Sequence, residues 1–235
     1  MQVVIVAFDD FTDLDVFLHW DMMTRVPYLY PERTDWRVRL LGTEDTHTSM
    51  GGLTIPMHGT IEEAVDADAV IISSGKGTRR LIEDKAYLAR LGAALSPQRQ
   101  RIGSQCSGAL ILAALGLLDG KTATTYPTAK ETLESFGVTV VEEPFVRHGN
   151  VATAGGCLAG LELSGWILEE LAGAAVRDAV LNSAAPVGAR LEIAPYRASL
   201  PAVDSGRPGI GENRPASRGE DALDATGRQP DRVRA

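Results

Sequence analysis

Residues 101–108 read Arg-Ile-Gly-Ser-Gln-Cys-Ser-Gly and join a short apolar run to a strongly apolar segment. A strand that ends in a small-x-nucleophile-x-Gly turn and then enters a helix is the nucleophile-elbow arrangement. Ser104 and Gly108 are the small residues on either side of Cys106. We therefore expect a tight turn at Cys106, followed by a buried helix over Ser107–Leu118.

Cys106 is the candidate nucleophile of this stretch. In an elbow its sulfur lies near the partial positive charge of a helix N-terminus. That field is expected to lower the thiol pKa and to favour the reactive thiolate. The alternative is an inert, buried apolar cysteine, which is the usual role of a free cysteine. The local pattern favours the reactive role.

Composition excludes several classes of protein. The chain has 235 residues, 44% of them hydrophobic, and a formal net charge of -8. This allows one sizeable α/β domain and argues against a nucleic-acid surface, which needs a basic face. Cys106 and Cys157 lie far apart without Cys-x-x-Cys spacing, so neither a metal site nor a disulfide framework is indicated.

The opening apolar run, Val3–Phe8, is too short for a signal peptide, and no segment is long and apolar enough to span a bilayer. We therefore expect a cytoplasmic protein that binds neither membrane nor nucleic acid.

Short β-branched runs alternate with longer helical patterns, which predicts βαβ units in an α/β fold with a mostly parallel sheet. The predicted strands are Val3–Phe8, Trp36–Leu41, Ala69–Ser73, Ile102–Gln105 and Val138–Val141, then a hairpin of Phe145–His148 and Val151–Thr153. The predicted helices are Val16–Thr24, Thr78–Leu95, Ser107–Leu118, Thr128–Phe136 and Gly160–Leu171. A small inserted hairpin is expected within Met50–Pro56.

Composition changes after about Pro186. Residues 187–235 are rich in Pro, Gly, Ser, Arg and Asp and contain few large apolar side chains. Such a segment cannot bury enough surface to offset its ordering entropy. We therefore expect a folded domain over 1–186 and a mostly disordered tail over 187–235. The tail lacks the two amphipathic helices with a basic face of a helix-turn-helix domain.

Sites in an open parallel sheet form beyond the carboxyl ends of the strands. The acidic loop 9–15, the loop Ser74–Gly77 and the elbow should therefore converge. Asp15 lies at the entry to an apolar helix. It is either a helix cap or a buried acid near Cys106, where it would be the general acid/base. The spacing leaves both roles open.

Other side chains and N–H groups are candidates for the same cleft. The N–H groups of Gly75 and Ser107 could form an anion or oxyanion pocket, although a plain strand-to-helix turn is the alternative. Cys157 follows a Gly-Gly pair before a helix and could also point into the cleft. His19 shares a helix face with Asp15, and we expect it to be an exposed or half-buried structural histidine. No conventional Cys–His pair is evident.

In this order, these segments resemble the ThiJ/PfpI superfamily, which is related to class I glutamine amidotransferases. The resemblance spans about residues 1–183 and rests on Val3–Asp15, Ile71–Gly77, Ser104–Gly108 and Gly149–Gly160. It implies a flavodoxin-like three-layer α/β/α sandwich with a mostly parallel central sheet and a nucleophile elbow. It also implies a homodimer that acts on a small-molecule substrate without a cofactor.

Leu14-Asp15 is similar to the isonitrile hydratase branch of that superfamily, where many relatives carry Glu. The resemblance implies that Cys106 attacks the terminal carbon of an isocyanide. Asp15 would move the protons and water would release an N-substituted formamide. Tyr126 stands where relatives often carry His; with a reference pKa of about 10 it would donate a hydrogen bond and not act as a base.

Two further functions stay open. One is a redox or reactive-carbonyl sensor in which Cys106 oxidises reversibly. The other is a non-catalytic ligand-binding member of the superfamily.

Overall fold

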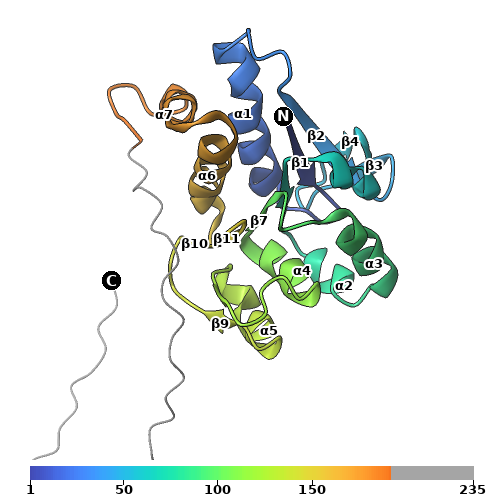
Figure 1. Cartoon of the computed structure of the whole chain (residues 1–235). Coiled ribbons are helices and arrows are strands. Elements are labelled where there is room, and N and C mark those ends of the chain that lie inside the picture. Colours follow the sequence, from blue (N-terminus) through green and yellow to red (C-terminus); the bar gives the residue numbers. More distant parts are fainter. Residues whose placement is uncertain (192–235) are drawn as a thin grey trace, which may run out of the picture. The chain divides into compact units, whose positions relative to one another are not determined.

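A seven-stranded central sheet organises the chain, whose residues 1–191 are described by a computed structural model (Figure 1). Its strand order is β10-β11-β7-β6-β1-β2-β5, and only β10 runs antiparallel to its neighbour. The strands are β1 Gln2–Val6, β2 Arg37–Gly42, β5 Gly59–Thr60, β6 Ala69–Ile72, β7 Arg101–Gln105, β10 Phe145–His148 and β11 Val151–Ala154. The predicted α/β fold with a mostly parallel sheet is confirmed.

The middle of the sheet consists of continuous apolar strands. Val3–Val6 of β1 and the whole of β6 have no exposed surface. Parallel strands that are covered on both faces show such runs, whereas a half-exposed strand would alternate. The hydrophobic core therefore lies on both sides of β1 and β6, and it fixes the strand ends from which the site is built.

Helices cover the sheet as two groups (Figure 1). In one group, α1 (Asp13–Leu29), α6 (Gly160–Ala172) and α7 (Ala174–Ser183) pack against one another. The other group comprises α2 (Thr78–Leu81), α3 (Lys85–Ala94), α4 (Ala109–Ala114) and α5 (Lys130–Ser135), linked through the α2–α3, α2–α4 and α4–α5 contacts. Short 3-10 turns complete the loops at η1 Ile61–Asp66, η2 Cys106–Gly108, η3 Pro127–Ala129 and η4 Cys157–Ala159.

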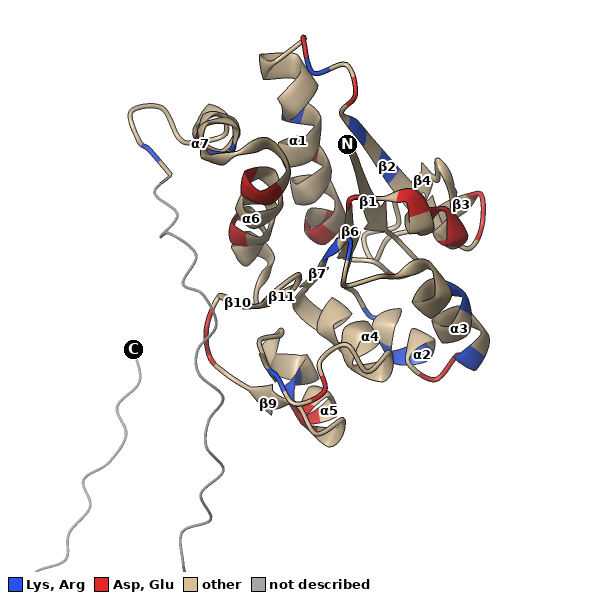
Figure 2. Ribbon diagram, viewed as in Figure 1, with Lys and Arg blue, Asp and Glu red and all other residues tan. Residues whose placement is uncertain are grey.

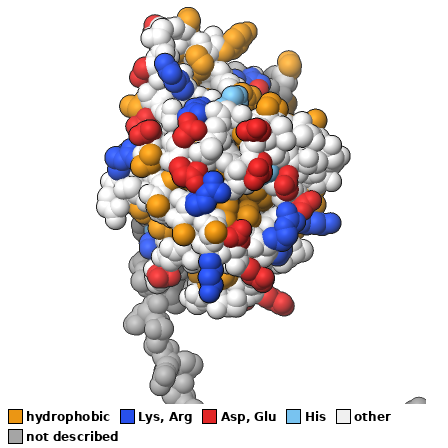
Figure 3. All heavy atoms as spheres, turned by 90° about the vertical axis from the view of Figure 1, so that its right-hand side faces the viewer, with side chains coloured by type: hydrophobic (Ala, Val, Ile, Leu, Met, Phe, Trp, Pro, Cys, Tyr) orange, Lys and Arg blue, Asp and Glu red, His pale blue; other side chains and the backbone are white. Residues whose placement is uncertain are grey.

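Charged residues of both signs are spread over helices and connecting loops (Figure 2). On the face drawn in Figure 3, acidic and basic side chains alternate with apolar ones, and neither sign forms a continuous patch there. Within residues 1–191, no helix is both long and apolar enough to cross a membrane.

Two small sheets differ in detail from the prediction. The inserted hairpin pairs β3 Thr46–Thr48 with β4 Thr54–Pro56, so it starts before the predicted Met50. The strand predicted over Val138–Val141 shrinks to β9 Thr139–Val140 and pairs with β8 Thr122–Ala123 in a separate sheet. Two-residue strands carry too little periodic signal to be assigned from sequence.

Helix α1 is longer than the predicted Val16–Thr24 because it continues through Pro27 to Leu29. A proline removes one helical N–H and leaves the carbonyl four residues earlier without its donor. Here that carbonyl belongs to Met23, and it accepts a 2.9 Å hydrogen bond from the indole Nε1–H of Trp36. Trp36 thus replaces the lost donor from outside the helix.

The helix predicted over Thr78–Leu95 is broken into α2 and α3. Asp84 caps α3, since its Oδ1 accepts hydrogen bonds of 3.0 Å from the N–H groups of Ala86 and Tyr87. Aspartate favours this capping position over a helix interior because its side chain satisfies free N–H groups of the first turn. The prediction of one continuous helix was therefore wrong.

Three other helices also depart from the prediction. The helix over Ser107–Leu118 is replaced by η2 and the six-residue α4, and the one over Thr128–Phe136 begins as η3. Helix α7 was not predicted; it starts after Gly173, whose φ of 90° ends α6. The expected tail beyond residue 191 lies outside the described residues.

Candidate active site

Four neighbouring parallel strands, β11, β7, β6 and β1, end at one edge of the sheet and supply the site. Cys106 follows β7, Ser74 follows β6, Cys157 follows β11, and Asp15 lies in the first turn of α1 after β1. Because parallel strands place their carboxyl ends together, segments far apart in the sequence converge there. The convergence predicted for the acidic loop, the Ser74–Gly77 loop and the elbow is what the structure shows.

The backbone at Cys106 is strained. Its φ of 46° is one of two positive values at non-glycine residues within residues 1–191. Left-handed backbone at a side chain other than Asn or Asp is uncommon and marks functional turns. Thr125 holds the turn in place, because its hydroxyl donates a 2.8 Å hydrogen bond to the Cys106 carbonyl. The side chain of Cys106 is 3% exposed and lines the pocket.

Gly108 allows the elbow to press against β6. A Cβ at this position would lie 2.5 Å from the Ser73 carbonyl oxygen and 2.8 Å from that of Ile72. Real Cβ atoms do not approach a carbonyl oxygen so closely, so glycine is required for packing and not for its φ. The close packing of the elbow on β6 therefore explains why glycine stands two residues after Cys106.

Asp15 is fully buried beside the nucleophile. Its Oδ2 accepts a hydrogen bond from the Ser74 hydroxyl, whereas its Oδ1 is buried without a partner among the described residues. One carboxylate oxygen of Asp15 and the two sulfurs of Cys106 and Cys157 lie within 4.8 Å of one another. The acid aimed at Cys106, and not the helix-capping alternative, is the arrangement in the structure.

The electrostatics of Cys106 contradict the expected low thiol pKa. Burial raises the pKa of the Cys106 thiol, the negative charge of Asp15 raises it further, and the Gln105 side chain opposes this shift by hydrogen bonding. Burial and Asp15 likewise raise the pKa of Cys157. Only a 3-10 turn and a short helix follow Cys106. Their field is outweighed, so Cys106 rests as a thiol.

A buried polar chain lies behind the sulfur. The Gln105 Nε2–H donates to the Cys106 Sγ at 3.4 Å and to the Gly156 carbonyl at 2.8 Å. Its carbonyl oxygen is buried near the fully buried His19 but makes no hydrogen bond to it, and the His19 Nδ1 lies 2.8 Å from the Ser164 hydroxyl. Burial lowers the pKa of His19 to about 4, so this histidine is neutral and structural at neutral pH.

Gly75 and Ser107 are neighbours in the structure and are joined to each other by hydrogen bonds. The Gly75 N–H is 3.2 Å from the Ser107 hydroxyl oxygen, and that hydroxyl also lies 3.2 Å from the Gly75 carbonyl. The N–H of Gly75, expected to face an anion, is thus occupied by Ser107. Gly75 has a φ of 143°, and a Cβ there would collide with the Asp10 carbonyl, so only glycine fits.

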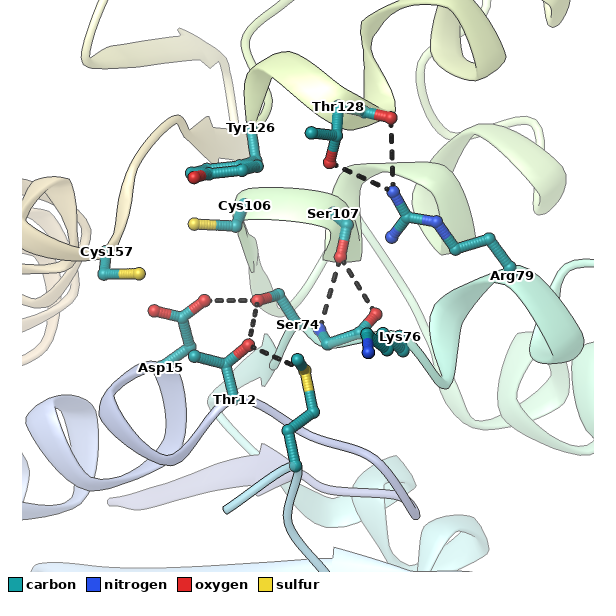
Figure 4. Close-up of a pocket in the computed structure, with 12 residues that line it drawn as sticks. Thr12, Asp15, Ser74, Lys76, Arg79, Cys106, Ser107, Tyr126, Thr128 and Cys157 are labelled. Carbon is teal, nitrogen blue, oxygen red and sulfur yellow. Dashed lines mark hydrogen bonds between the residues drawn. The ribbon is translucent and has the colours of Figure 1, made fainter.

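The pocket around these groups has a volume of about 460 Å³ (Figure 4). All six candidate residues of the sequence analysis line it: Asp15, Gly75, Cys106, Ser107, Tyr126 and Cys157. Tyr126, 45% exposed, lies near its opening. Asp15, Cys106 and Cys157 offer one ligand atom each and could bind a thiophilic cation.

The chain matches a known protein family. The sequence profile described as the DJ-1/PfpI family matches residues 1–170. The chain belongs to the DJ-1/PfpI family. An isonitrile hydratase of Pseudomonas putida is 30% identical to it over 209 residues, which cover 88% of this chain and 83% of that protein.

Solved structures of the DJ-1/PfpI family share the fold. A THiJ/PfpI family protein from Pseudomonas syringae superposes with a TM-score of 0.65 at 26% identity, over 76% of this chain and 72% of that one. Schizosaccharomyces pombe DJ-1 gives a TM-score of 0.67 at 18% identity, over 79% of this chain and 100% of that one. The flavodoxin-like sandwich implied by the sequence resemblance is thereby confirmed.

Some polar residues of this DJ-1/PfpI site were not singled out from sequence. Ser74 was named only as part of a glycine-rich loop, and Gln105 only as part of the strand before the nucleophile. The expectation that His19 is exposed or half-buried was wrong, because the packing of α1 against α6 buries it completely. The one sequence feature that could have identified Gln105 is its polar side chain at the end of a buried strand.

Proposed function

We propose that this chain is a cofactor-independent, cysteine-dependent hydratase that adds water to an isonitrile and releases an N-substituted formamide. The observation that carries the proposal is the buried pair of Cys106 and Asp15 at the bottom of a pocket. The 30% identity to the P. putida isonitrile hydratase supports the same chemistry.

The first step joins the sulfur to the substrate. The thiol Sγ of Cys106 forms a bond to the terminal carbon of the isonitrile while Asp15 takes the thiol proton and delivers it to that carbon. The product is a thioformimidate, R–N=CH–S–Cys106, with no change in total charge. Because its surroundings raise the pKa of the Cys106 thiol, the sulfur needs Asp15 to take its proton as the bond to carbon forms.

The second step uses water. Asp15 accepts a proton from the water as the water oxygen bonds to the thioformimidate carbon, and it passes this proton to the imine nitrogen. The carbon–sulfur bond then breaks, Cys106 recovers its proton from the hydroxyl of the intermediate through Asp15, and the formamide leaves. The net reaction adds one water molecule, which explains why no redox cofactor is needed.

Neighbouring groups position this chemistry. The Ser74 hydroxyl orients Asp15 by donating to Oδ2, which leaves Oδ1 for proton transfer. The Ser107 N–H, next to the nucleophile, and the Tyr126 hydroxyl are the proposed donors to the substrate nitrogen as it gains electron density. Gly75 forms part of the pocket wall and hydrogen-bonds to the Ser107 hydroxyl. Cys157 forms another part of the same wall.

The redox-sensor alternative is weaker in this geometry. Peroxide reacts with thiolates, and the surroundings raise the pKa of both thiols of the pocket, Cys106 and Cys157. A non-catalytic ligand-binding role predicts ligand binding that survives substitution of Cys106. The same turnover experiment separates both alternatives from the hydratase.

The test is a proton NMR time course with cyclohexyl isocyanide that follows the formyl proton of the formamide. We expect formamide with the wild-type chain, none with Cys106→Ala, and retained turnover with Asp13→Asn, a control in α1 outside the residues that line the pocket. Absence of formamide at high protein concentration, or its formation by Cys106→Ala, would overturn the proposal.

A further inference from the structure

The pocket has opposite charges at its two ends. Its one carboxylate, Asp15, lies at the bottom with Cys106, whereas two cations, Lys76 and Arg79, line the other side. Within residues 1–191, neither cation has a carboxylate within 4.0 Å. Arg80, the next residue along the chain, is different because it pairs with Asp10 at 2.5 Å.

Neutral groups hold the guanidinium of Arg79. Its Nη2–H donates to the Thr128 carbonyl at 3.2 Å and to the Thr128 hydroxyl at 3.4 Å, and its Nη1–H donates to the Thr78 hydroxyl at 3.3 Å. None of these acceptors carries a charge. A guanidinium has five N–H donors, and Nε–H has no acceptor in the described part of the chain. Arg79 is therefore fixed in place with its charge uncompensated and donors to spare.

One pocket includes both ends, since Cys106 and Arg79 line the same cavity. In Figure 4, Ser107 lies between Cys106 and the guanidinium of Arg79. The volume of about 460 Å³ falls in the range of sites that hold whole small-molecule ligands, so a bare isocyano group would leave most of it empty. A substrate whose reactive carbon meets Cys106 thus extends its body toward Arg79.

We propose that Arg79 and Lys76 form a carboxylate subsite, and that the substrate is an isonitrile carrying a carboxylate at the end remote from its isocyano group. This rests on the proposed function. The planar fork of an arginine matches the two oxygens of a carboxylate. The exposed Lys76 adds attraction at the entrance of a chain whose net charge is -8.

The test compares two substrates of nearly the same shape, 4-isocyanobenzoate and the neutral 4-isocyanobenzamide. For the wild-type chain we expect a KM about tenfold lower for the carboxylate, the size of one charge-assisted contact. Arg79→Gln should remove this difference in KM. Lys76→Gln should reduce it, and because Lys76 is exposed its replacement should leave the fold intact. Added salt should also reduce the difference in KM, since it screens the charges. Arg80→Gln is the matched control and leaves it unchanged.

A second measurement separates this inference from the hydratase itself. Binding of the corresponding products, 4-formamidobenzoate and 4-formamidobenzamide, is titrated calorimetrically and needs no turnover. If neither isonitrile reacts, the proposed function fails, while tighter binding of 4-formamidobenzoate that depends on Arg79 still supports the subsite. Equal KM and equal binding for the two members of each pair, or a preference unaffected by Arg79→Gln and Lys76→Gln, overturns the subsite.

Discussion

Cys106 is buried, strained and protonated at rest, which sets the chemistry available to it. The loss of water on burial and, after it, the negative charge of Asp15 oppose formation of a thiolate. A nucleophile in this state acts together with a proton acceptor. Asp15 is that acceptor, and its Oδ1, buried without a partner in the described chain, is the atom left free for the transfer.

Removing the charge of Asp15 should make Cys106 more acidic and yet inactive. In Asp15→Asn the thiol pKa falls, because the negative charge that raised it is gone, while turnover falls by two orders of magnitude or more, on the order of the contribution of a general acid/base. The measurement is the pH dependence of alkylation by iodoacetamide in a Cys157→Ser background, with formamide production alongside.

Asp13→Asn, two residues earlier in the same helix turn, is the control and leaves both quantities unchanged. An Asp15→Asn variant that alkylates at the same pH midpoint as the parent would contradict the assigned electrostatics.

At the scale of the elements, α1, β7 and α6 meet behind the sulfur. The Gln105 amide at the end of β7 donates to the Gly156 carbonyl and to Cys106, while His19 of α1 and Ser164 of α6 are joined to each other nearby. Gln105 is therefore a positioning residue: it acts through the sulfur and does not line the pocket wall.

Gln105→Leu should raise the Cys106 pKa further, since it removes the hydrogen bond that favours the thiolate. We expect the pH midpoint of alkylation to rise and kcat to fall about tenfold, the value of one hydrogen bond of roughly 1.4 kcal/mol. The control is Gln100→Leu, which removes another buried amide, bonded to the Ala64 carbonyl at 2.6 Å away from the pocket. Equal effects of the two variants would show that the cost is only structural.

The elements also show where prediction from sequence succeeds. The apolar runs of β1 and β6 and the turn around Cys106 carry strong local signals, so the sheet and the elbow were predictable. The break at Asp84, the continuation of α1 through Pro27 and the existence of α7 depend on tertiary contacts. For Pro27 the deciding contact is Trp36, which no local pattern reveals. The high thiol pKa was missed for the same reason, since it follows from the burial of the sulfur and from its distance to Asp15.

For the whole molecule, the buried His19 links stability to pH. Its pKa is lowered to about 4 in the folded chain, from an unfolded value near 6.5. The unfolded state therefore binds more protons between these values, and this contribution to stability, complete above pH 6.5, is lost as the pH falls through about 4. The contribution is on the order of 3 kcal/mol.

His19→Gln should flatten the dependence of the free energy of unfolding on pH between 6.5 and 4. Urea titrations across this range measure it, with His148→Gln as the control for removing a histidine elsewhere. If wild type and His19→Gln lose stability in parallel as the pH falls, the buried neutral state assigned to His19 is wrong.

The homodimer implied by the family resemblance stays a prediction. Light scattering on the full chain should give about twice the monomer mass of 25.1 kDa. A mass that stays at the monomer value over a wide concentration range would contradict it.

The covalent step is the central claim, and mass spectrometry of the protein during turnover tests it most directly. Samples with excess isocyanide are treated with cyanoborohydride, which reduces a thioformimidate to a stable thioaminal, R–NH–CH2–S. The account predicts that the peptide containing Cys106 gains the mass of the isocyanide plus two hydrogens, and that the peptide containing Cys157 does not. Formamide production without any adduct on Cys106, or an adduct on Cys157 alone, would contradict it.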